Sequence, residues 1–146
     1  ETIIDCMITG QEMVFGARGV MRTGKECIWL PNGMKLNYKG LERSDSGDAS
    51  YFDGRARTKI HGPLLTENVT QCLHRLIVSE QMLEIAATVI KAALWPYDEV
   101  VAVVPVNAAE TALQFMIQTM AKAPAWATGL PLMGEGWIAD NYVEVK

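Results

Sequence analysis

The sequence predicts an α+β fold in which helices pack on an antiparallel sheet. Two pairs of strand-like runs are each joined by turn-forming residues, and two long stretches place apolar residues at helical spacing. The predicted order is hairpin, strand, long helix, hairpin, helix and strand. We expect a single domain over residues 1–146, because a chain of this length can bury a core of its own.

The composition is that of a globular protein, with 49% hydrophobic and 21% charged residues. No apolar stretch reaches the roughly 18 residues of a membrane span, and the first residues lack a secretory signal pattern, so we expect no membrane partner. Cys6, Cys27 and Cys72 are odd in number and widely spaced, which argues against a disulfide framework or zinc site and indicates a reducing, cytoplasmic compartment. A net charge of −4 disfavours an independent DNA clamp.

The first 60 residues predict strands and turns. Within 1–20, apolar residues allow a helix, whereas Gly10, Gly16 and Gly19 disfavour one. Apolar residues alternate on both sides of the sequence Pro-Asn-Gly at 31–33, which predicts a hairpin in the segment 25–60.

The polar stretch 41–50 predicts a loop, and an Asp-Gly turn at 53–54 precedes a further strand. Arg55, Arg57 and Lys59 alternate along that strand. They form either a phosphate-facing stripe or the solvated face of an edge strand.

Two helices follow from apolar spacing. The long one covers residues 63–89, with Glu67 and Asn68 as expected N-terminal capping residues. The second covers 107–121, where Asn107 and Glu110 resemble a capping box. The segment 122–146 is rich in loops and is expected to end in a strand at 137–145. His61 and His74 are thirteen residues apart and do not form a local metal pair.

The stretch "ALWPYDEVVAVVP" (93–105) predicts a hairpin over 91–104. Its second strand, 99–104, does not alternate and is expected to be buried on both faces. Pro96 belongs at an edge, a bulge or a turn. Asp98 and Glu99 leave two interpretations open: a solvated turn, or a turn whose carboxylates bind Mg²⁺.

Four segments in chain order carry a resemblance: "IWLPNGMKLNY", "HGPLLTENVTQCLHR", "YDEVVAVVP" and "PAWATGLPLMGEG". Together they resemble the C-terminal end of family A DNA polymerases, especially the phage type. The similarity covers most of residues 28–142. Several separate motifs in the right order make it more specific than any one of them.

The resemblance implies a polymerase palm in which Asp98 is the metal-binding aspartate of motif C and Glu99 its catalytic neighbour. In that family two Mg²⁺ ions align the attacking and leaving oxygens of nucleotidyl transfer. Tyr97 stands where motif C has histidine, and it can still donate a hydrogen bond to the primer. Pro96 replaces an apolar strand residue. The resemblance also implies DNA-binding roles for Arg57, His61, Glu67, Asn68, Gln71 and Tyr97.

Other departures concern missing parts. His61 replaces a tyrosine of the phage pattern and Leu64 a lysine. No motif A aspartate and no fingers helix with its lysine and arginine are present. The resemblance therefore implies that residues 1–24 connect to missing fingers. It also implies that the two-metal site is shared with residues outside this chain.

The expected partners are primer-template DNA, dNTP and the remaining polymerase segment with motif A, fingers and thumb. We expect that the chain does not polymerise alone and that its exposed palm surface can self-associate. The expected compartment is the cytoplasm, that of a bacterial host if the chain is phage-encoded. One alternative is a relic palm that docks onto polymerase or DNA without turnover. Another is an unrelated hydrolase using Asp98 and Glu99, which lacks further ligands.

Overall fold

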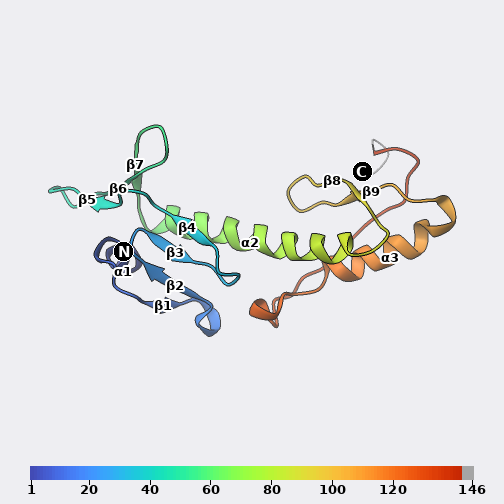
Figure 1. Ribbon diagram of the computed structural model, residues 1–146, viewed down its shortest axis with the longest axis horizontal. Coiled ribbons are helices and arrows are strands. Elements are labelled where there is room, and N and C mark those ends of the chain that lie inside the picture. The colour runs from blue at the N-terminus through green and yellow to red at the C-terminus, as the bar shows by residue number, and fades with distance from the viewer. Residues whose placement is uncertain (143–146) are drawn as a thin grey trace. The chain divides into compact units, whose positions relative to one another are not determined.

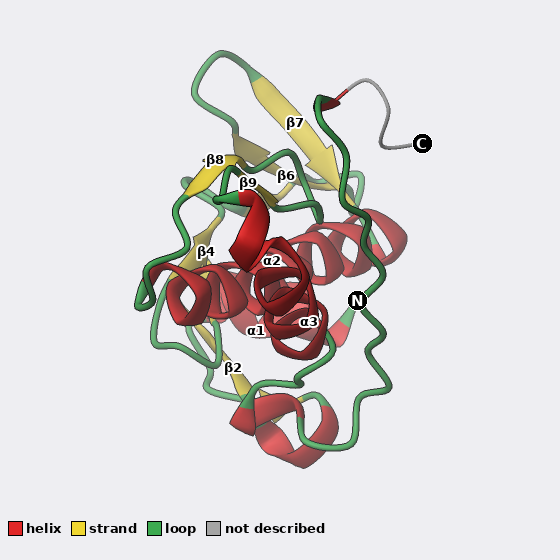
Figure 2. Cartoon of the chain, turned by 90° about the vertical axis from the view of Figure 1, so that its right-hand side faces the viewer, coloured by secondary structure: helices red, strands yellow, loops and turns green. Residues whose placement is uncertain are grey.

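The computed structural model describes residues 1–142 and divides into two compact units, Glu1–Leu73 and His74–Lys146. The boundary lies inside the long helix α2, Gly62–Ala86 (Figure 1). Short strands, three α-helices and long loops make up the described chain (Figure 2). The predicted α+β class with antiparallel strands is confirmed. The single domain over 1–146 stays a prediction.

The N-terminal unit begins with helix α1, Thr2–Thr9, which ends where Gly10 adopts a left-handed φ of 83°. Part of the segment 1–20 is therefore helical, and Gly10 ends the helix. A four-stranded antiparallel sheet follows in the order β1-β2-β3-β4. Its strands are β1 Val14–Phe15, β2 Met21–Gly24, β3 Cys27–Trp29 and β4 Lys35–Asn37. The short 3₁₀ helix η1, Ala17–Gly19, separates β1 from β2.

The predicted Pro-Asn-Gly hairpin is confirmed, because Ile28 pairs with Leu36 across the β3–β4 turn. Gly33 takes the positive φ that such a turn requires. Ile28 and Leu36 are the central residues of β3 and β4, and because they lie directly opposite each other their side chains point to the same face of the sheet, as the alternating pattern predicts.

A second antiparallel sheet has the order β5-β6-β7, with β5 Glu42–Arg43, β6 Ala49–Phe52 and β7 Arg57–Ile60. The predicted loop over 41–50 is therefore wrong. Polar residues form a hairpin there because Gly47 closes a turn onto the Ser44 carbonyl. Arg43 adds an ion pair to Asp5 at 2.5 Å. The predicted strand after the Asp-Gly turn is confirmed as β7.

The interior of the N-terminal unit centres on Tyr38, which is 1% exposed. Its ring meets Tyr51 edge to face, with 5.0 Å between centroids. Other side chains with essentially no exposure in this unit are Ile4, Met7, Ile28 and Thr23.

Helix α2 confirms the predicted long helix but begins at Gly62 and ends at Ala86. The capping assignment of Glu67 and Asn68 is wrong, because both lie beyond the first turn of the helix. His61 caps the helix instead, because the backbone amide of Leu64 donates a hydrogen bond to its Nδ1 at 3.4 Å. An imidazole nitrogen thus accepts from one of the otherwise unpaired first-turn amides.

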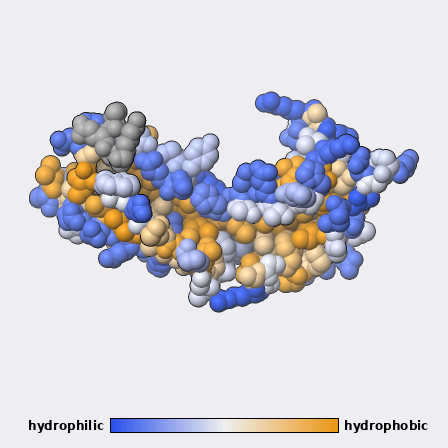
Figure 3. All heavy atoms as spheres, turned by 180° about the vertical axis from the view of Figure 1, so that it is seen from behind, coloured by the Kyte–Doolittle hydropathy of each residue, from blue (hydrophilic) through white to orange (hydrophobic). Residues whose placement is uncertain are grey.

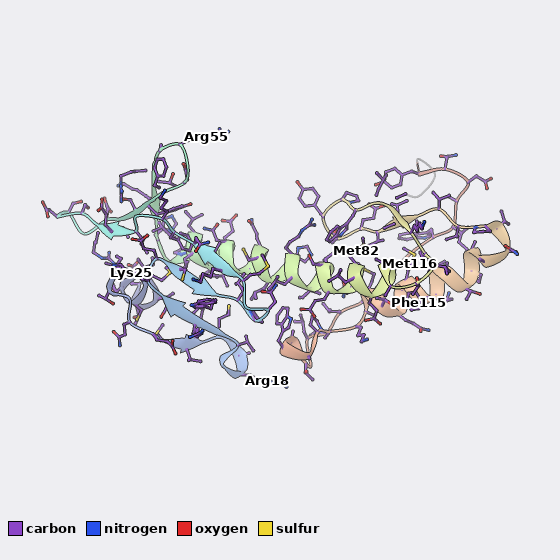
Figure 4. The ribbon with its side chains drawn as sticks, in the orientation of Figure 1. Arg18, Lys25, Arg55, Met82, Phe115 and Met116 are labelled. Atoms are coloured by element: carbon purple, nitrogen blue, oxygen red, sulfur yellow. The ribbon has the colours of Figure 1, made fainter. Side chains whose placement is uncertain are left out.

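The C-terminal unit contains the hairpin β8 Ala92–Leu94 and β9 Val101–Ala102, which confirms the predicted antiparallel pair. It also contains α3 Ala109–Met120, flanked by the 3₁₀ helices η2 Val106–Ala108 and η3 Ala125–Ala127. Ile85, Ile90 and Ala112 form its buried centre. Around them pack Val100, Ala102, Val104, Phe115, Met116 and Met120; Figure 4 shows Phe115 and Met116 on α3 beside α2.

The predictions for β9 and for the start of α3 are wrong. The second strand, β9, is short, and both of its residues are only half-buried. Val103, which the prediction also placed in this strand, is 80% exposed. Hydrophobic side chains also reach the surface elsewhere in the molecule (Figure 3). Val89 and Val106 are among the most exposed, at 95% and 93%. Asn107 does not cap α3, because the 3₁₀ helix precedes it and Glu110 instead accepts from Gln114.

The predicted strand at 137–145 is not formed over 137–142, and residues 143–145 lie outside the described part of the chain. Cys6, Cys27 and Cys72 are free thiols. Among the helices of residues 1–142, none combines the length and the apolar character that a membrane crossing requires.

Candidate functional site

The turn between β8 and β9 carries the predicted metal-binding residues. The Glu99 amide donates to the Pro96 carbonyl at 2.9 Å, which closes a four-residue turn. Tyr97, the second residue of the turn, has a φ of 46°, a conformation that favours glycine. A side chain in this left-handed region costs about 1–2 kcal/mol. Pro96 thus lies in a turn, one of its three expected places.

Asp98 and Glu99 differ in their surroundings although both are exposed. Within residues 1–142 the Asp98 carboxylate makes no hydrogen bond or ion pair. The Glu99 carboxylate accepts a hydrogen bond from the Tyr142 hydroxyl at 3.1 Å. This bond raises the pKa of Tyr142, because the phenol proton is held against a negative charge.

No cluster of three or more His, Cys, Asp or Glu side chains suited to a metal ion occurs within residues 1–142. Asp98 therefore offers one hard oxygen ligand, and Glu99 a second that is already hydrogen-bonded. The described residues do not complete a metal site around these two carboxylates.

Trp95, next to the turn, is held by Arg75 of α2. The guanidinium carbon lies 4.0 Å from the centre of the Trp95 ring, the geometry of a cation–π contact. The indole Nε1 is buried and has no hydrogen-bond partner in the described chain. Sequence reasoning missed this pair, because twenty positions separate its members and no local spacing links them.

The N-terminal half of α2 presents a shallow, open surface that is lined by residues of this helix alone. Its lining consists of Gly62, Pro63, Thr66, Glu67, Thr70 and Gln71. Two of the predicted DNA-binding residues, Glu67 and Gln71, therefore lie together on one exposed face. The Gln71 amide donates to the Glu67 carboxylate at 3.2 Å. This face presents a carboxylate and a side-chain amide to solvent.

Asn68 serves a different contact. Its amide nitrogen donates to the Tyr38 hydroxyl at 3.2 Å in the interior of the N-terminal unit. Burial raises the pKa of Tyr38 to about 12, while the Asn68 hydrogen bond acts in the opposite direction. Asn68 thus satisfies a buried hydroxyl, and a DNA-binding role for it stays a prediction.

Arg57 is engaged within its sheet. Its guanidinium pairs with Glu42 at 2.8 Å and donates to the Gly40 carbonyl at 2.9 Å. Lys59 pairs with Asp48 at 2.8 Å, which lowers the pKa of that carboxyl. These ion pairs are solvent-exposed, so each contributes little stability and its cation can exchange partners.

Arg55 does not belong to the β7 strand. It lies in the loop between β6 and β7, where Figure 4 shows it at the tip. Its amide donates to the Asp53 carboxylate at 2.8 Å. The predicted three-residue stripe along one strand is therefore wrong, because the Asp-Gly turn extends through Arg55.

The predicted site residues fall into two groups. Arg57, His61, Glu67, Asn68 and Gln71 belong to the N-terminal unit, and Tyr97, Asp98 and Glu99 share one turn of the C-terminal unit. This chain matches no protein-family model, no curated protein and no solved structure.

Proposed function

We propose that this chain is the palm portion of a family A DNA-directed DNA polymerase and that Asp98 is its motif C metal ligand. The observation that carries the proposal is the Asp98 carboxylate itself. It is exposed and unpartnered within residues 1–142, and it lies in the turn of an antiparallel hairpin. The sequence resemblance assigns the motif C aspartate to this position.

A free carboxylate fits Mg²⁺, which prefers oxygen ligands and keeps several of its waters. Asp98 would hold the cation, with Glu99 beside it, and the remaining ligands belong to the segment that carries motif A. When bound, a pair of such cations stabilises the attacking and leaving oxygens of phosphoryl transfer. Tyr97 is 85% exposed, so its hydroxyl is available to a primer phosphate or sugar.

The α2 face supports DNA as the partner. Glu67 and Gln71 lie on a shallow, exposed surface there. Side-chain amides and carboxylates hydrogen-bond to base edges, and they do so without the basic charge that a phosphate clamp needs. The chain's net charge of −4 leaves backbone neutralisation to the remaining polymerase segment.

The first prediction concerns Asp98→Asn. We expect Mn²⁺, added with a primer-template duplex, to broaden the NMR amide signals of residues 97–100 in the wild-type chain. Asp98→Asn should weaken this effect by about tenfold or more, because it removes the charged oxygen ligand. The same duplex should shift the signals of Glu67 and Gln71 in both proteins.

Asp45→Asn is the matched control. Asp45 is also an exposed aspartate in a hairpin turn, the one closed by Gly47 and Ser44, but it lies in the other unit. It should leave the broadening at residues 97–100 unchanged. Equal broadening in wild-type and Asp98→Asn proteins would contradict the metal role. If the duplex shifted the signals of Glu67 and Gln71 but Mn²⁺ did not broaden those of residues 97–100, the result would favour the alternative of a module that docks onto DNA without turnover.

A further inference from the structure

A segment that contains no strand and no α-helix packs closely on α3. We call residues 128–142 the α3 strap. A Cβ atom placed on Gly134 would lie 2.6 Å from the Ile117 carbonyl oxygen, and one on Gly136 would lie 2.7 Å from Leu113 Cδ1. Real Cβ contacts essentially never approach so closely. The strap backbone therefore contacts α3 directly at both glycines.

The strap ends at the candidate metal site. Tyr142 donates its O–H to Glu99 Oε2 at 3.1 Å, across 43 positions of sequence. Tyr142 is 47% exposed, so packing alone does not hold its ring in place. A hydrogen bond to an ionised acceptor is stronger than one between neutral groups. The contact thus joins the strap to the last residue of the Pro96–Glu99 turn.

The turn is held at both ends, and its centre is left free. Arg75 covers Trp95 at one end, at 4.0 Å, and Tyr142 binds Glu99 at the other. Neither contact uses the Asp98 carboxylate. Because Tyr97 already has a strained left-handed φ, the turn needs such restraints to keep a single conformation.

We propose that Tyr142 is a positioning residue: carried by the α3 strap, its O–H holds Glu99 so that the turn presents Asp98 to a divalent cation. The cation-binding half of this inference rests on the proposed function. The restraint on the turn does not, because it follows from the Tyr142–Glu99 contact alone.

The test compares Tyr142→Phe with wild type by two NMR measurements. The amide of residue 99, which closes the turn, should exchange its hydrogen about threefold to tenfold faster in Tyr142→Phe. Mn²⁺ affinity at residues 97–100 should fall by a similar factor, since a group that orients a ligand tunes metal binding. Tyr51→Phe, the same chemical change in the N-terminal unit, should alter neither measurement.

A double variant separates positioning from general loosening. If Tyr142 acts through Glu99, adding Tyr142→Phe to Glu99→Ala should not further accelerate exchange at residue 99. The restraint would be overturned if the amide of residue 99 exchanged at the wild-type rate in Tyr142→Phe. It would also be overturned if that amide exchanged faster in the double variant than in Glu99→Ala alone. Unchanged Mn²⁺ affinity in Tyr142→Phe would overturn the positioning role. A wild-type chain that binds no Mn²⁺ at the turn would overturn the proposed function, while the exchange measurement would still decide the restraint.

Discussion

Tyr38→Ala is expected to lower the free energy of unfolding by about 3–5 kcal/mol, the usual cost of removing a buried aromatic ring. Tyr38 is 1% exposed and packs edge to face against Tyr51. Its removal leaves a cavity at the centre of the N-terminal unit and takes the acceptor from the Asn68 amide. Urea unfolding followed by circular dichroism measures the loss.

Tyr38→Phe is the control for the ring. It keeps the apolar volume and loses only the hydroxyl, so we expect a loss of about 1 kcal/mol. If Tyr38→Phe destabilised the chain as much as Tyr38→Ala, the hydrogen bond would dominate and the packing argument would be wrong.

The Tyr38 hydroxyl also predicts an alkaline dependence of stability. The folded state raises the pKa of Tyr38 to about 12 from the ordinary 10 of a free tyrosine. The unfolded state therefore loses this proton first, and stability falls as the pH rises from about 10 to 12. Two pKa units correspond to a limit of about 3 kcal/mol. Tyr38→Phe should show a smaller loss over the same pH range, and an identical loss would exclude Tyr38 as the cause.

Gly134→Ala is expected to destabilise the contact between the α3 strap and α3 by about 1–3 kcal/mol. The added Cβ would meet a backbone oxygen, that of Ile117, at 2.6 Å. A carbonyl oxygen inside a helix cannot rotate away as the tip of a side chain can. The strap must therefore shift. Thermal unfolding measures the cost, and NMR signals of Leu113 and Ile117 report the displacement.

Gly62→Ala provides the matched control for Gly134→Ala. Gly62 begins α2, has no positive φ, and, apart from its chain neighbours His61 and Pro63, has no atom within 4 Å of an added Cβ. Alanine there should change the free energy of unfolding by less than about 1 kcal/mol, because the lower entropy of the unfolded chain is offset by crowding of the new Cβ against the following Pro63. Equal destabilisation by both substitutions would mean that glycine flexibility, and not close approach to α3, explains the effect at Gly134.

Local patterns in the sequence predicted an element correctly where the residues of that segment alone favour its structure. The Pro-Asn-Gly turn predicted the β3–β4 hairpin, because glycine at position 33 meets the positive φ that the turn demands. Uninterrupted helical spacing predicted α2 within three residues at either end. Turn residues at 96–99 predicted the break between β8 and β9. The similarity to polymerase motifs singled out Asp98 within this last turn.

Local patterns failed where polar residues form strands or where a competing contact takes over a side chain. Arg43 appeared to be a loop residue, yet an ion pair to Asp5, 38 positions away, accompanies a strand there. Asn68 appeared to be a helix cap, yet it donates to Tyr38, which is 30 positions away. Asn107 lost its capping role because one turn of 3₁₀ helix precedes α3. No periodicity encodes such partners.

The sequence by itself determined the two helices α2 and α3 and the β3–β4 and β8–β9 turns, and it singled out Asp98 as the candidate metal ligand, because propensity, turn chemistry and motif order are local properties. Only the tertiary structure decided which side chains contact the two ends of the Pro96–Glu99 turn. Arg75 reaches Trp95 from α2, and Tyr142 reaches Glu99 from the α3 strap. These contacts form only when the intervening chain folds back. The physical reason is that hydrogen bonds and cation–π contacts depend on distance in space, not on distance along the chain.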